Sequence, residues 1–243
     1  MKLLQLNAWA GRLDRQIGAL LAQETPDIAC LQEAISYQPE DAGFFLTIEN
    51  MQQAYKLPYA VVAPVISFQL QRNTAEWGNC ILSKTPIDKS ETVFTYLEHT
   101  PNFQYGMDNG NVRNFVHATI QVDGKPCNII THHGFWVPEH KNGNDETLRQ
   151  MQILAEYIDG CSGAVIVAGD FNLAPHSESL KLINSRLHNL SISHNLKTTR
   201  THLTHKTEVC DYIFVNDAVK VNDFHASDEI VSDHKALILD FDI

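Results

Sequence analysis

An apolar run changes to polar residues within the stretch Ala164-Val165-Ile166-Val167-Ala168-Gly169-Asp170-Phe171-Asn172. Short apolar, β-branched runs of this kind are typical of buried strands. Asp170 and Asn172 follow the run at the point where the strand is expected to end. Gly, Asp and Asn also favour plain tight turns, which is the alternative interpretation. A buried strand that holds polar groups at its end is, however, one way in which a rigid scaffold builds a functional site.

The same junction occurs at four other places along the chain. Asn7 follows the apolar residues 3–6, Glu33 follows residues 28–32, His132 and His133 follow residues 129–131, and Ser232-Asp233-His234 precedes the last expected strand. Asn, Glu and Asp oxygens are the hard ligands that Mg²⁺ and Mn²⁺ prefer, and Asp–His pairs suit general acid–base catalysis. Each junction alone has an ordinary structural explanation, but together they predict one polar site at the ends of several strands.

Strands outnumber helices in the rest of the pattern. Two segments have apolar residues at helical spacing: residues 12–23, which Pro26 ends, and residues 145–158. Residues 114–122 and 127–131 flank the turn Asp123-Gly124-Lys125, which is a hairpin signal. Further strands are expected at residues 59–65, 79–83, 90–96, 209–215, 219–224 and 236–241. Because several connections are hairpins, the pattern favours two layered sheets flanked by helices over one all-parallel sheet.

The chain has 243 residues and a formal net charge of −11. Its length and the lack of a linker predict one domain over residues 1–243. No apolar stretch approaches the roughly 20 residues of a membrane-spanning helix, and the first residues contain no signal-peptide core. We therefore expect a cytoplasmic protein with no membrane association and no obligate protein partner. The 5 cysteines are widely spaced and mostly lie in apolar runs, so we expect free thiols rather than disulfides or a zinc site.

The acidic balance also bears on the class of partner. Non-specific affinity for nucleic acid comes mainly from Lys and Arg that release counterions, and this sequence contains no run of such residues. A nucleic-acid partner would therefore need a local basic patch or a metal ion. Excess carboxylate suits divalent-cation sites, although most surface acids only keep a protein in solution.

Five motifs, in chain order, resemble the signatures of the endonuclease/exonuclease/phosphatase superfamily. They are Leu6-Asn7-Ala8-Trp9, Asp27-Ile28-Ala29-Cys30-Leu31-Gln32-Glu33, Ala168-Gly169-Asp170-Phe171-Asn172, Asp211-Tyr212-Ile213-Phe214 and Ser232-Asp233-His234. The superfamily includes DNase I-like nucleases, exonuclease III-type repair enzymes, inositol polyphosphate phosphatases and sphingomyelinases. The resemblance spans residue 3 to the C-terminus. It implies an α/β (α+β) fold, a four-layer α/β/β/α sandwich in which helices flank two packed mixed sheets.

The resemblance also implies a role for each motif residue. Glu33 would be the principal ligand of a catalytic Mg²⁺ (or Mn²⁺), assisted by Asn7 and Asp233. Asp170 would orient or deprotonate the attacking water, and Asn172 would hold a phosphate oxygen. These five residues would form the metal and water part of the site.

Two histidines would complete the catalytic set. His234 would contact the scissile phosphate and would be oriented by Asp211. For the second histidine we choose His133, because His133-Gly134-Phe135-Trp136 is similar to a subgroup of the superfamily, but His132 fits a Thr-His pattern as well. An adjacent Asp raises the pKa of a histidine, so we expect cationic imidazoles to supply much of the positive charge of the pocket.

Three further residues are candidates for substrate binding: Asn79, Arg113 and Trp136. A surface salt bridge is the plain alternative for Arg113, and loop packing is the alternative for Trp136. For the aromatic residues Phe135, Trp77 and Tyr105, the two interpretations are likewise stacking on a substrate and packing within the core or a loop.

The expected function is hydrolysis of a phosphodiester or phosphomonoester by a metal-dependent enzyme that activates water for in-line attack. The expected partner is a phosphoester substrate, either a small phosphorylated molecule or a nucleic acid. A DNA or RNA nuclease of the same superfamily is one alternative, which the acidic balance disfavours. A binding module that keeps the fold without catalysis is the other, and it predicts gaps among the motif residues that this sequence does not have.

Overall fold

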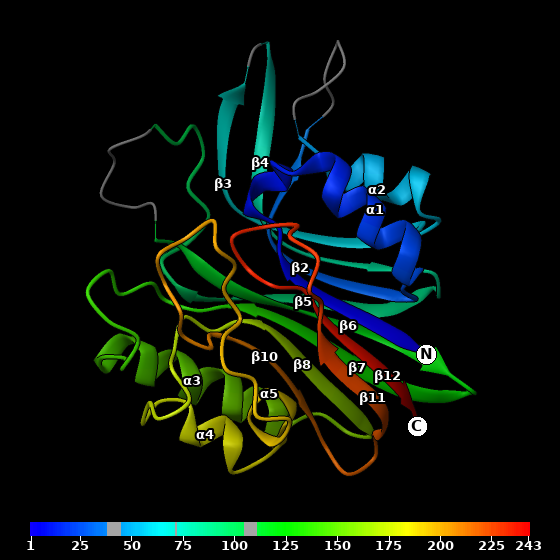
Figure 1. The fold of residues 1–243 in the computed structure, drawn as a ribbon, viewed down its shortest axis with the longest axis vertical. Helices are drawn as coiled ribbons and strands as arrows, with labels where there is room; N and C mark the ends of the chain where they lie inside the picture. Colours follow the sequence, from blue (N-terminus) through cyan, green and yellow to red (C-terminus); the bar gives the residue numbers. More distant parts are fainter. Residues whose placement is uncertain (38–44, 71, 105–110) are drawn as a thin grey trace.

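Two sheets of six strands pack face to face in the computed structural model, which describes residues 1–37, 45–70, 72–104 and 111–243 (Figure 1). The first sheet has the order β11-β12-β1-β2-β4-β3, and the second has the order β5-β6-β7-β8-β10-β9. The strands of the first sheet are β1 (Lys2–Asn7), β2 (Ile28–Ser36), β3 (Tyr59–Leu70), β4 (Asn73–Ser83), β11 (Lys220–Ala226) and β12 (Leu237–Asp242). Those of the second are β5 (Ile87–Tyr96), β6 (Arg113–Val122), β7 (Lys125–His133), β8 (Ala164–Asp170), β9 (His188–Asn189) and β10 (Asp211–Val215).

Helices cover the outer face of each sheet (Figure 1). The short 3₁₀ helix η1 (Trp9–Gly11), α1 (Asp14–Glu24) and α2 (Ile48–Ala54) lie on the first sheet, and α3 (Asp145–Asp159), α4 (Lys181–Asn184) and α5 (Leu190–Ser193) accompany the second. The side chains of Asn144 and Thr147 form a capping box that starts α3. Thr25 adopts a left-handed conformation (φ 44°) at the end of α1, directly before Pro26.

Three apolar layers hold the elements together. The central layer joins the inner faces of both sheets and contains, for example, Leu3 and Ile81 from the first sheet and Ile129 and Ile166 from the second. A second layer packs α1 and α2 on the first sheet, and a third packs α3 and α4 on the second. The expected four-layer α/β/β/α sandwich of mixed sheets is therefore confirmed.

The pairing of the strands brings their polar ends together. β1 and β2 are parallel, with Asn7 opposite Gln32 and thus beside Glu33. β7 and β8 are also parallel and end at the same level, with His133 opposite Asp170. β10 runs antiparallel to β8, so its first residue, Asp211, lies opposite Asp170 as well. Side chains from distant parts of the sequence therefore meet at one end of the sandwich.

The structure differs from the sequence prediction at the β3–β4 hairpin and in short elements that were not predicted, which are η1, α2, α4, β9 and α5. β3 and β4 form a hairpin longer than the expected strands at residues 59–65 and 79–83, and it rises from the body of the molecule in Figure 1. The outer part of this hairpin lies beyond the central core, so its sequence lacks the continuous apolar run on which the prediction relied. Helix α2 was not predicted, because only two of its 7 residues, Ile48 and Met51, are buried.

All cysteines are free, and four of them are buried, as expected. Among the described residues, no helix is both long enough and apolar enough to cross a lipid bilayer.

Candidate functional site

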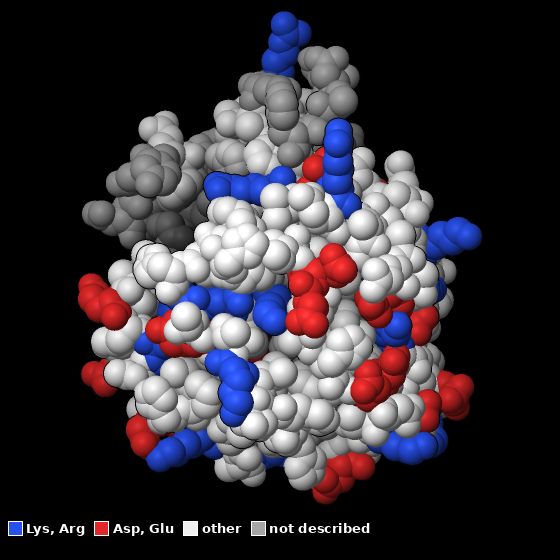
Figure 2. Space-filling model, viewed as in Figure 1, with Lys and Arg blue, Asp and Glu red and all other residues white. Residues whose placement is uncertain are grey.

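A cavity of about 240 Å³ opens where the polar strand ends meet. All of the residues that line it except Trp136 are polar or charged: Glu33, Arg113, His133, Trp136, Asp170, Asn172, Arg200, Lys206, Asp233 and His234. Figure 2 shows basic and acidic side chains next to one another across the middle of the face that it presents. The overall charge of −11 therefore conceals a region of mixed charge.

Glu33 reaches this cavity because the backbone of β2 is irregular at that point. The pairing between β2 and β4 shifts register between Leu31 and Ala34, which is a β-bulge, and Glu33 within it has a left-handed conformation (φ 51°). A bulge re-aims a side chain, and a non-glycine residue with positive φ is a costly conformation that occurs at functional sites. The carboxylate of Glu33 accepts a hydrogen bond from Asn7 Nδ2 at 3.1 Å.

Asn7 connects two carboxylates. Its Nδ2 donates to Glu33 and, at 3.2 Å, to Asp170 Oδ2, while its Oδ1 accepts the backbone N–H of Trp9. The other oxygen of Asp170, Oδ1, accepts the backbone N–H of Asn172 at 2.9 Å. Both oxygens of Asp170 are thus held in place, and this buried carboxylate has a fixed orientation.

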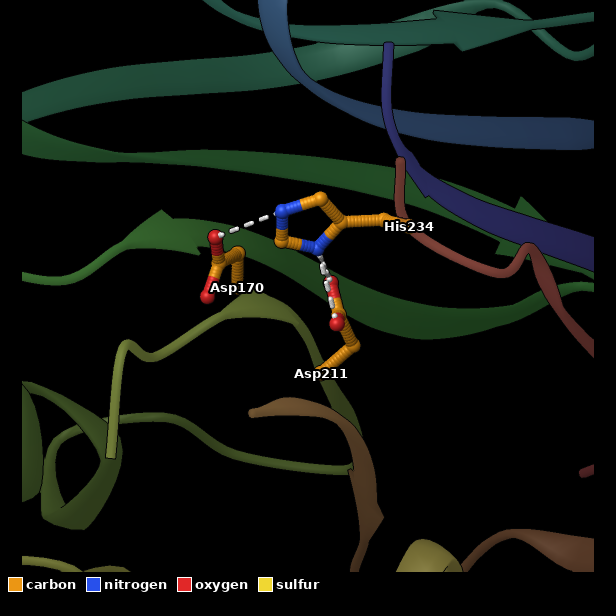
Figure 3. A group of neighbouring side chains, drawn as sticks. All are labelled: Asp170, Asp211 and His234. Atoms are coloured by element: carbon orange, nitrogen blue, oxygen red, sulfur yellow. Dashed lines mark hydrogen bonds and ion pairs between the residues drawn. The ribbon is translucent and has the colours of Figure 1, made fainter. Parts of the chain in front are cut away.

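His234 lies between two carboxylates, which Figure 3 shows from the side. Its Nδ1 donates to Asp211 at 2.9 Å, and its Nε2 lies 3.6 Å from Asp170 Oδ2. Burial lowers the pKa of His234, but the negative charges of Asp211 and Asp170 outweigh this effect and raise its pKa above the ordinary value. For Asp170, burial acts to raise the pKa, but the nearby positive charges of His234 and Arg200 hold it below the usual range.

A row of buried hydrogen bonds fixes Asp211 from behind. Asp211 accepts from Thr199 Oγ1 at 2.6 Å and from Gln5 Nε2 at 3.3 Å. Gln5 Nε2 also donates to Gln32 Oε1, and Gln32 Nε2 donates to Thr131 Oγ1, each at 2.8 Å. These polar side chains lie between the two sheets, so the position of Asp211 is set by the interior of the sandwich.

The two neighbouring histidines of β7 point in opposite directions, as successive residues of a strand do. His133 lines the cavity, with its Nε2 3.8 Å from Asp170 and 4.0 Å from Glu33. His132 points away from it, fully buried, and its ring packs against Phe171 at a centroid distance of 5.0 Å. Of the two candidates that the sequence left open, His133 is therefore the one in the cavity.

The expectation of two cationic histidines needs correction. Burial, and next the positive charge of Arg113, lower the pKa of His133 well below its ordinary value, so its imidazole is neutral at neutral pH. The positive charge that was expected from the His133 ring comes instead from arginine and lysine side chains in the cavity. Arg113 is buried and donates to the carbonyls of Gly134 and Val112, and burial lowers its pKa to about 10.

Arg200 is the main residue that sequence reasoning missed. Its guanidinium is almost fully buried, contacts Nε2 of His234 through Nη1, and lies 4.0 Å from Asp233. Arg200 pairs with His234 through an isolated β-bridge, and this pairing places it in the cavity. Burial lowers the pKa of Arg200, but Asp170 and Asp211 outweigh this and raise it above its ordinary value.

Two lysines were missed as well. Lys141 is buried and donates to Asn172 Oδ1 at 2.7 Å, while Asn172 Nδ2 donates to the carbonyl of Gly134. Lys206 lies over the ring of Trp136 at 5.6 Å from its centroid. Both lysines and Arg200 come from irregular segments, where no periodic pattern in the sequence could have pointed to them.

The substrate-binding candidates are not placed alike. Arg113 and Trp136 line the cavity, and Trp136 is 43% exposed at its rim. Asn79 is not among the lining residues, because its amide is buried and donates to the backbone and side-chain oxygens of Asn114. Tyr105 lies outside the described residues.

The donor set fits a divalent cation. The carboxylates of Glu33, Asp170 and Asp233 line one cavity, and burial together with the negative charges of the other two raises the pKa of Glu33. A bound cation would remove this repulsion, and hard oxygen donors suit Mg²⁺ or Mn²⁺. Asp170, Asp211 and His234 form another group with metal-ligand spacing. In that group, however, Asp211 is completely buried and accepts hydrogen bonds from three side chains, so its oxygens are engaged in orienting His234 rather than in binding a metal ion.

The chain is similar to proteins of one family in its sequence and in its fold. The model of the Endonuclease/Exonuclease/phosphatase family matches residues 4–234. A family protein of that name from Leptotrichia buccalis C-1013-b has 17% identity and a TM-score of 0.73, with 100% of both chains covered. A mannosyl-6-phosphatase from Bacteroides thetaiotaomicron VPI-5482 has 15% identity and a TM-score of 0.69, again with 100% of both chains covered. TDP2 of D. rerio, complexed with a single-strand DNA product, has 15% identity and a TM-score of 0.68 over 100% of this chain and 99% of that one.

No curated protein matches the chain in sequence. The match to the family model nevertheless covers nearly the whole chain, and the solved structures share its fold. The chain therefore belongs to the endonuclease/exonuclease/phosphatase family, whose members are hydrolases of phosphoester bonds that are generally dependent on a divalent metal.

Proposed function

We propose that this member of the endonuclease/exonuclease/phosphatase family hydrolyses a small phosphodiester or phosphomonoester with the help of Mg²⁺ or Mn²⁺. The observation that carries the proposal is the convergence of Glu33, Asp170 and His234 on one cavity, with His234 held between Asp170 and Asp211. These groups come from three distant parts of the chain, and the motifs that contain them were recognised independently of their positions in space.

Glu33 is the principal ligand of the cation in this proposal, and Asp233 and Asn7 assist it. Asn7 directs its N–H group, and not its oxygen, toward Glu33. It therefore becomes a ligand only after its amide turns over and gives up the hydrogen bond from Trp9. When bound, the cation would neutralise part of the negative charge on the phosphate and on the leaving oxygen.

Asp170 and His234 do the proton chemistry. Asp170 accepts a hydrogen bond from the attacking water and aims it at phosphorus. Its depressed pKa makes it a weak base, so orientation of the water is its larger contribution. His234, with Nδ1 fixed by Asp211, presents Nε2 to the phosphate once Nη1 of Arg200, which contacts Nε2 in this structure, also turns to the phosphate. Its raised pKa favours the protonated form, which donates a hydrogen bond to a phosphate oxygen.

The remaining lining residues bind and position the phosphate. Arg200 and Lys206 bring positive charge to the cavity wall, and a guanidinium binds phosphate oxygens in a bidentate manner. Asn172 holds a phosphate oxygen through its amide, whose place is fixed by Lys141 and Gly134. His133 contributes a neutral ring that hydrogen-bonds the phosphate.

Two properties support a small substrate over a long nucleic acid. The cavity is small, about 240 Å³, and the chain carries a net charge of −11. Both kinds of molecule occur among the similar structures, since one is a mannosyl-6-phosphatase and another is complexed with a single-strand DNA product. A nuclease is therefore the second candidate, supported by the local basic residues Arg113, Arg200 and Lys206.

The test uses bis-p-nitrophenyl phosphate and p-nitrophenyl phosphate with Mg²⁺ and Mn²⁺, and compares wild type with Glu33→Gln and His234→Gln. We expect both variants to lose hydrolysis while they keep the wild-type circular dichroism spectrum. Glu156→Gln and His99→Gln, at exposed positions outside the cavity, are the matched controls and should retain full activity. Wild-type turnover in either cavity variant would refute the assigned roles.

Two further measurements separate the alternatives. Nuclease action predicts cleavage of DNA or RNA that falls steeply as salt increases, whereas a small phosphoester in the cavity predicts a weak salt effect. A catalytically silent module predicts that neither Mg²⁺ nor Mn²⁺ raises the Tm. A metal site at Glu33 predicts a higher Tm with either cation in wild type and no such rise in Glu33→Gln.

A further inference from the structure

A second cavity, of about 580 Å³, adjoins the first. Aromatic and aliphatic side chains make up most of its lining, which comprises Trp9, Ala10, Arg12, Glu33, Ile35, Phe45, Ile66, Phe68, Gln69, Leu70, Trp77 and Phe103. Trp9 and Glu33 belong to motifs of the sequence, but most of the lining residues do not, and none of the proposed catalytic steps uses the aromatic side chains. Five of its lining residues carry aromatic rings, so the cavity offers an unusual concentration of ring faces and edges.

The two cavities adjoin at Glu33, which lines both of them. Trp77, in the aromatic cavity, also lies against His133 of the polar cavity, with ring centroids 6.2 Å apart and planes tilted by 60°. A phosphate bound in the polar cavity would therefore have one of its ester groups directed toward the aromatic cavity. The volume of about 580 Å³ is within the usual range for sites that bind small organic groups.

The backbone holds one wall of this cavity in a defined place. Trp9 and Ala10 both have left-handed conformations (φ 47° and 56°), which are uncommon for residues other than glycine. Gly11 follows with φ 69°, and a Cβ on it would meet the carbonyl oxygen of Leu46 at 2.4 Å. The guanidinium of Arg12 then lies 4.7 Å from the centroid of the Trp9 ring. Trp9 is thus presented to the cavity by a tightly constrained turn.

Another part of the wall comes from the β3–β4 hairpin and from residues that pack beside it. Ile35, Tyr37 and Ala75 form a small buried cluster, and Phe45, Phe68 and Leu70 pack on it at the side of the cavity. Arg12 and Gln69 add polar groups at the edge of this mainly apolar surface. A planar ring with a polar edge matches such a surface, because ring faces can stack on the aromatic side chains while ring nitrogens meet the polar groups.

We propose that this aromatic cavity binds the planar heteroaromatic ring of one ester group of the substrate, and that the substrate class is therefore a nucleotide phosphoester. The inference rests on the proposed function, because it uses the phosphate site to place the ring. An acyl chain is the other apolar group that occurs joined to phosphate. Aromatic rings outnumber aliphatic side chains in the lining, and the charged groups of Arg12 and Glu33 lie in the cavity wall, so the lining favours a ring over a chain.

The experiment measures binding without turnover. Asp170→Asn, saturated with Mg²⁺, is titrated calorimetrically with adenosine 5′-monophosphate, ribose 5-phosphate, phenyl phosphate and decyl phosphate. The first two ligands carry the same phosphate and sugar and differ in the base alone. We expect the base to strengthen binding by roughly tenfold, the size of one base–aromatic stacking contact. Phenyl phosphate should lie between the two, because it has a ring without ring nitrogens.

Variants of cavity residues test whether the difference in affinity between adenosine 5′-monophosphate and ribose 5-phosphate arises in the aromatic cavity. Phe68→Ala and Phe103→Ala, each in the Asp170→Asn background, should reduce the preference for adenosine 5′-monophosphate toward one and leave the affinity for ribose 5-phosphate unchanged. Phe94→Ala, a half-buried phenylalanine of β5 outside the cavity, is the matched control and should keep the preference. Two single variants are used because loss of Phe68 could weaken the small cluster on which it packs, and the Tm reports this for each.

Each outcome decides a different point. Equal affinity for adenosine 5′-monophosphate and ribose 5-phosphate would show that the aromatic cavity is not a site for the ring (the ring site), but it would not contradict the proposed phosphoesterase activity. Tightest binding of decyl phosphate overturns the ring site in favour of an acyl chain. Binding of none of the phosphate ligands overturns the ring site and the proposed function together. A base preference that persists in both phenylalanine variants would place the ring elsewhere.

Discussion

Replacement of Asp211 by asparagine tests how far the buried Asp–His pair determines activity. Asp211 accepts hydrogen bonds from His234 Nδ1 at 2.9 Å, Thr199 Oγ1 at 2.6 Å and Gln5 Nε2 at 3.3 Å. An asparagine of the same shape has one acceptor oxygen and one donor nitrogen, so it cannot accept from all three donors. At least one of these hydrogen bonds must be lost, and the bond to His234 also loses its charge.

The size of the effect follows from the charged hydrogen bond. Hydrogen bonds to charged groups contribute about 1.5–3 kcal/mol. If the transition state depends on this bond, the activation free energy rises by that amount, and kcat falls roughly 10- to 150-fold. KM should change less, because Arg200 and Asn172 are not altered. The pKa of His234 should also fall, since Asp211 is the first of the charges that raise it.

The assay is the steady-state hydrolysis of bis-p-nitrophenyl phosphate, with the Tm measured in parallel. Asp217→Asn is a matched control, because Asp217 forms an Asp–His pair with His188 at 2.6 Å, but on the surface, with side chains that are 94% and 69% exposed. It should leave kcat within about twofold of wild type, as expected for an exposed ion pair. An Asp211→Asn variant that is folded and retains the wild-type kcat would refute the positioning of His234 by Asp211.

Three other changes have defined expected results. The variant His132→Leu should be less sensitive to acid than wild type. Burial lowers the pKa of His132 to about 3, so as the pH falls below about 6.5 only the unfolded state binds this proton. Wild type should therefore lose about 2 kcal/mol of its free energy of unfolding by pH 5, which urea unfolding at pH 7 and pH 5 measures. An equal loss in the variant would show that other groups are responsible. Gly169→Ala should destabilise the fold by about 3 kcal/mol, because a Cβ there would lie 1.9 Å from the carbonyl oxygen of His132. The control is Gly160→Ala, whose Cβ would lie at an ordinary contact distance of 3.4 Å from the carbonyl oxygen of Tyr157. This control should have wild-type stability in the same unfolding assay. Arg200→Lys should raise KM for the phosphoester roughly tenfold with a smaller change in kcat, because lysine lacks the planar guanidinium; an unchanged KM would exclude Arg200 from phosphate binding.

The layered fold and the strand-end residues could be predicted from the sequence for the same physical reason. Strands buried between two layers must be apolar, so the position where Val167 and Ala168 give way to Asp170 marks the point where the strand leaves the apolar layers and reaches the cavity. The parallel pairs β1–β2 and β7–β8 then bring such ends to the same level. The alternation of side chains along β7 places His133 in the cavity, but the sequence did not reveal which face of β7 would meet it.

The basic residues of the cavity could not be predicted in this way. Arg200, Lys141 and Lys206 lie in segments without regular spacing, and each is brought to the cavity by a tertiary contact, such as the bridge between Arg200 and His234. The neutral state of His133 depends on burial and on the neighbouring Arg113, and neither is visible in sequence. The bulge that directs Glu33 is equally invisible, because no glycine marks it.

The hydrogen bonds from Gln32 to Thr131 and from Gln5 to Asp211 have a consequence for the motions of the molecule. They cross from one sheet to the other in a mainly apolar layer, where a misplaced amide would have no partner. Sliding of one sheet over the other would break both at once, so the seam between β1 and β2 on one side and β7 and β10 on the other resists shear more strongly than apolar packing alone. Amide protons along this seam should exchange with deuterium among the slowest in the chain, while opening fluctuations occur at the hairpin and the rim.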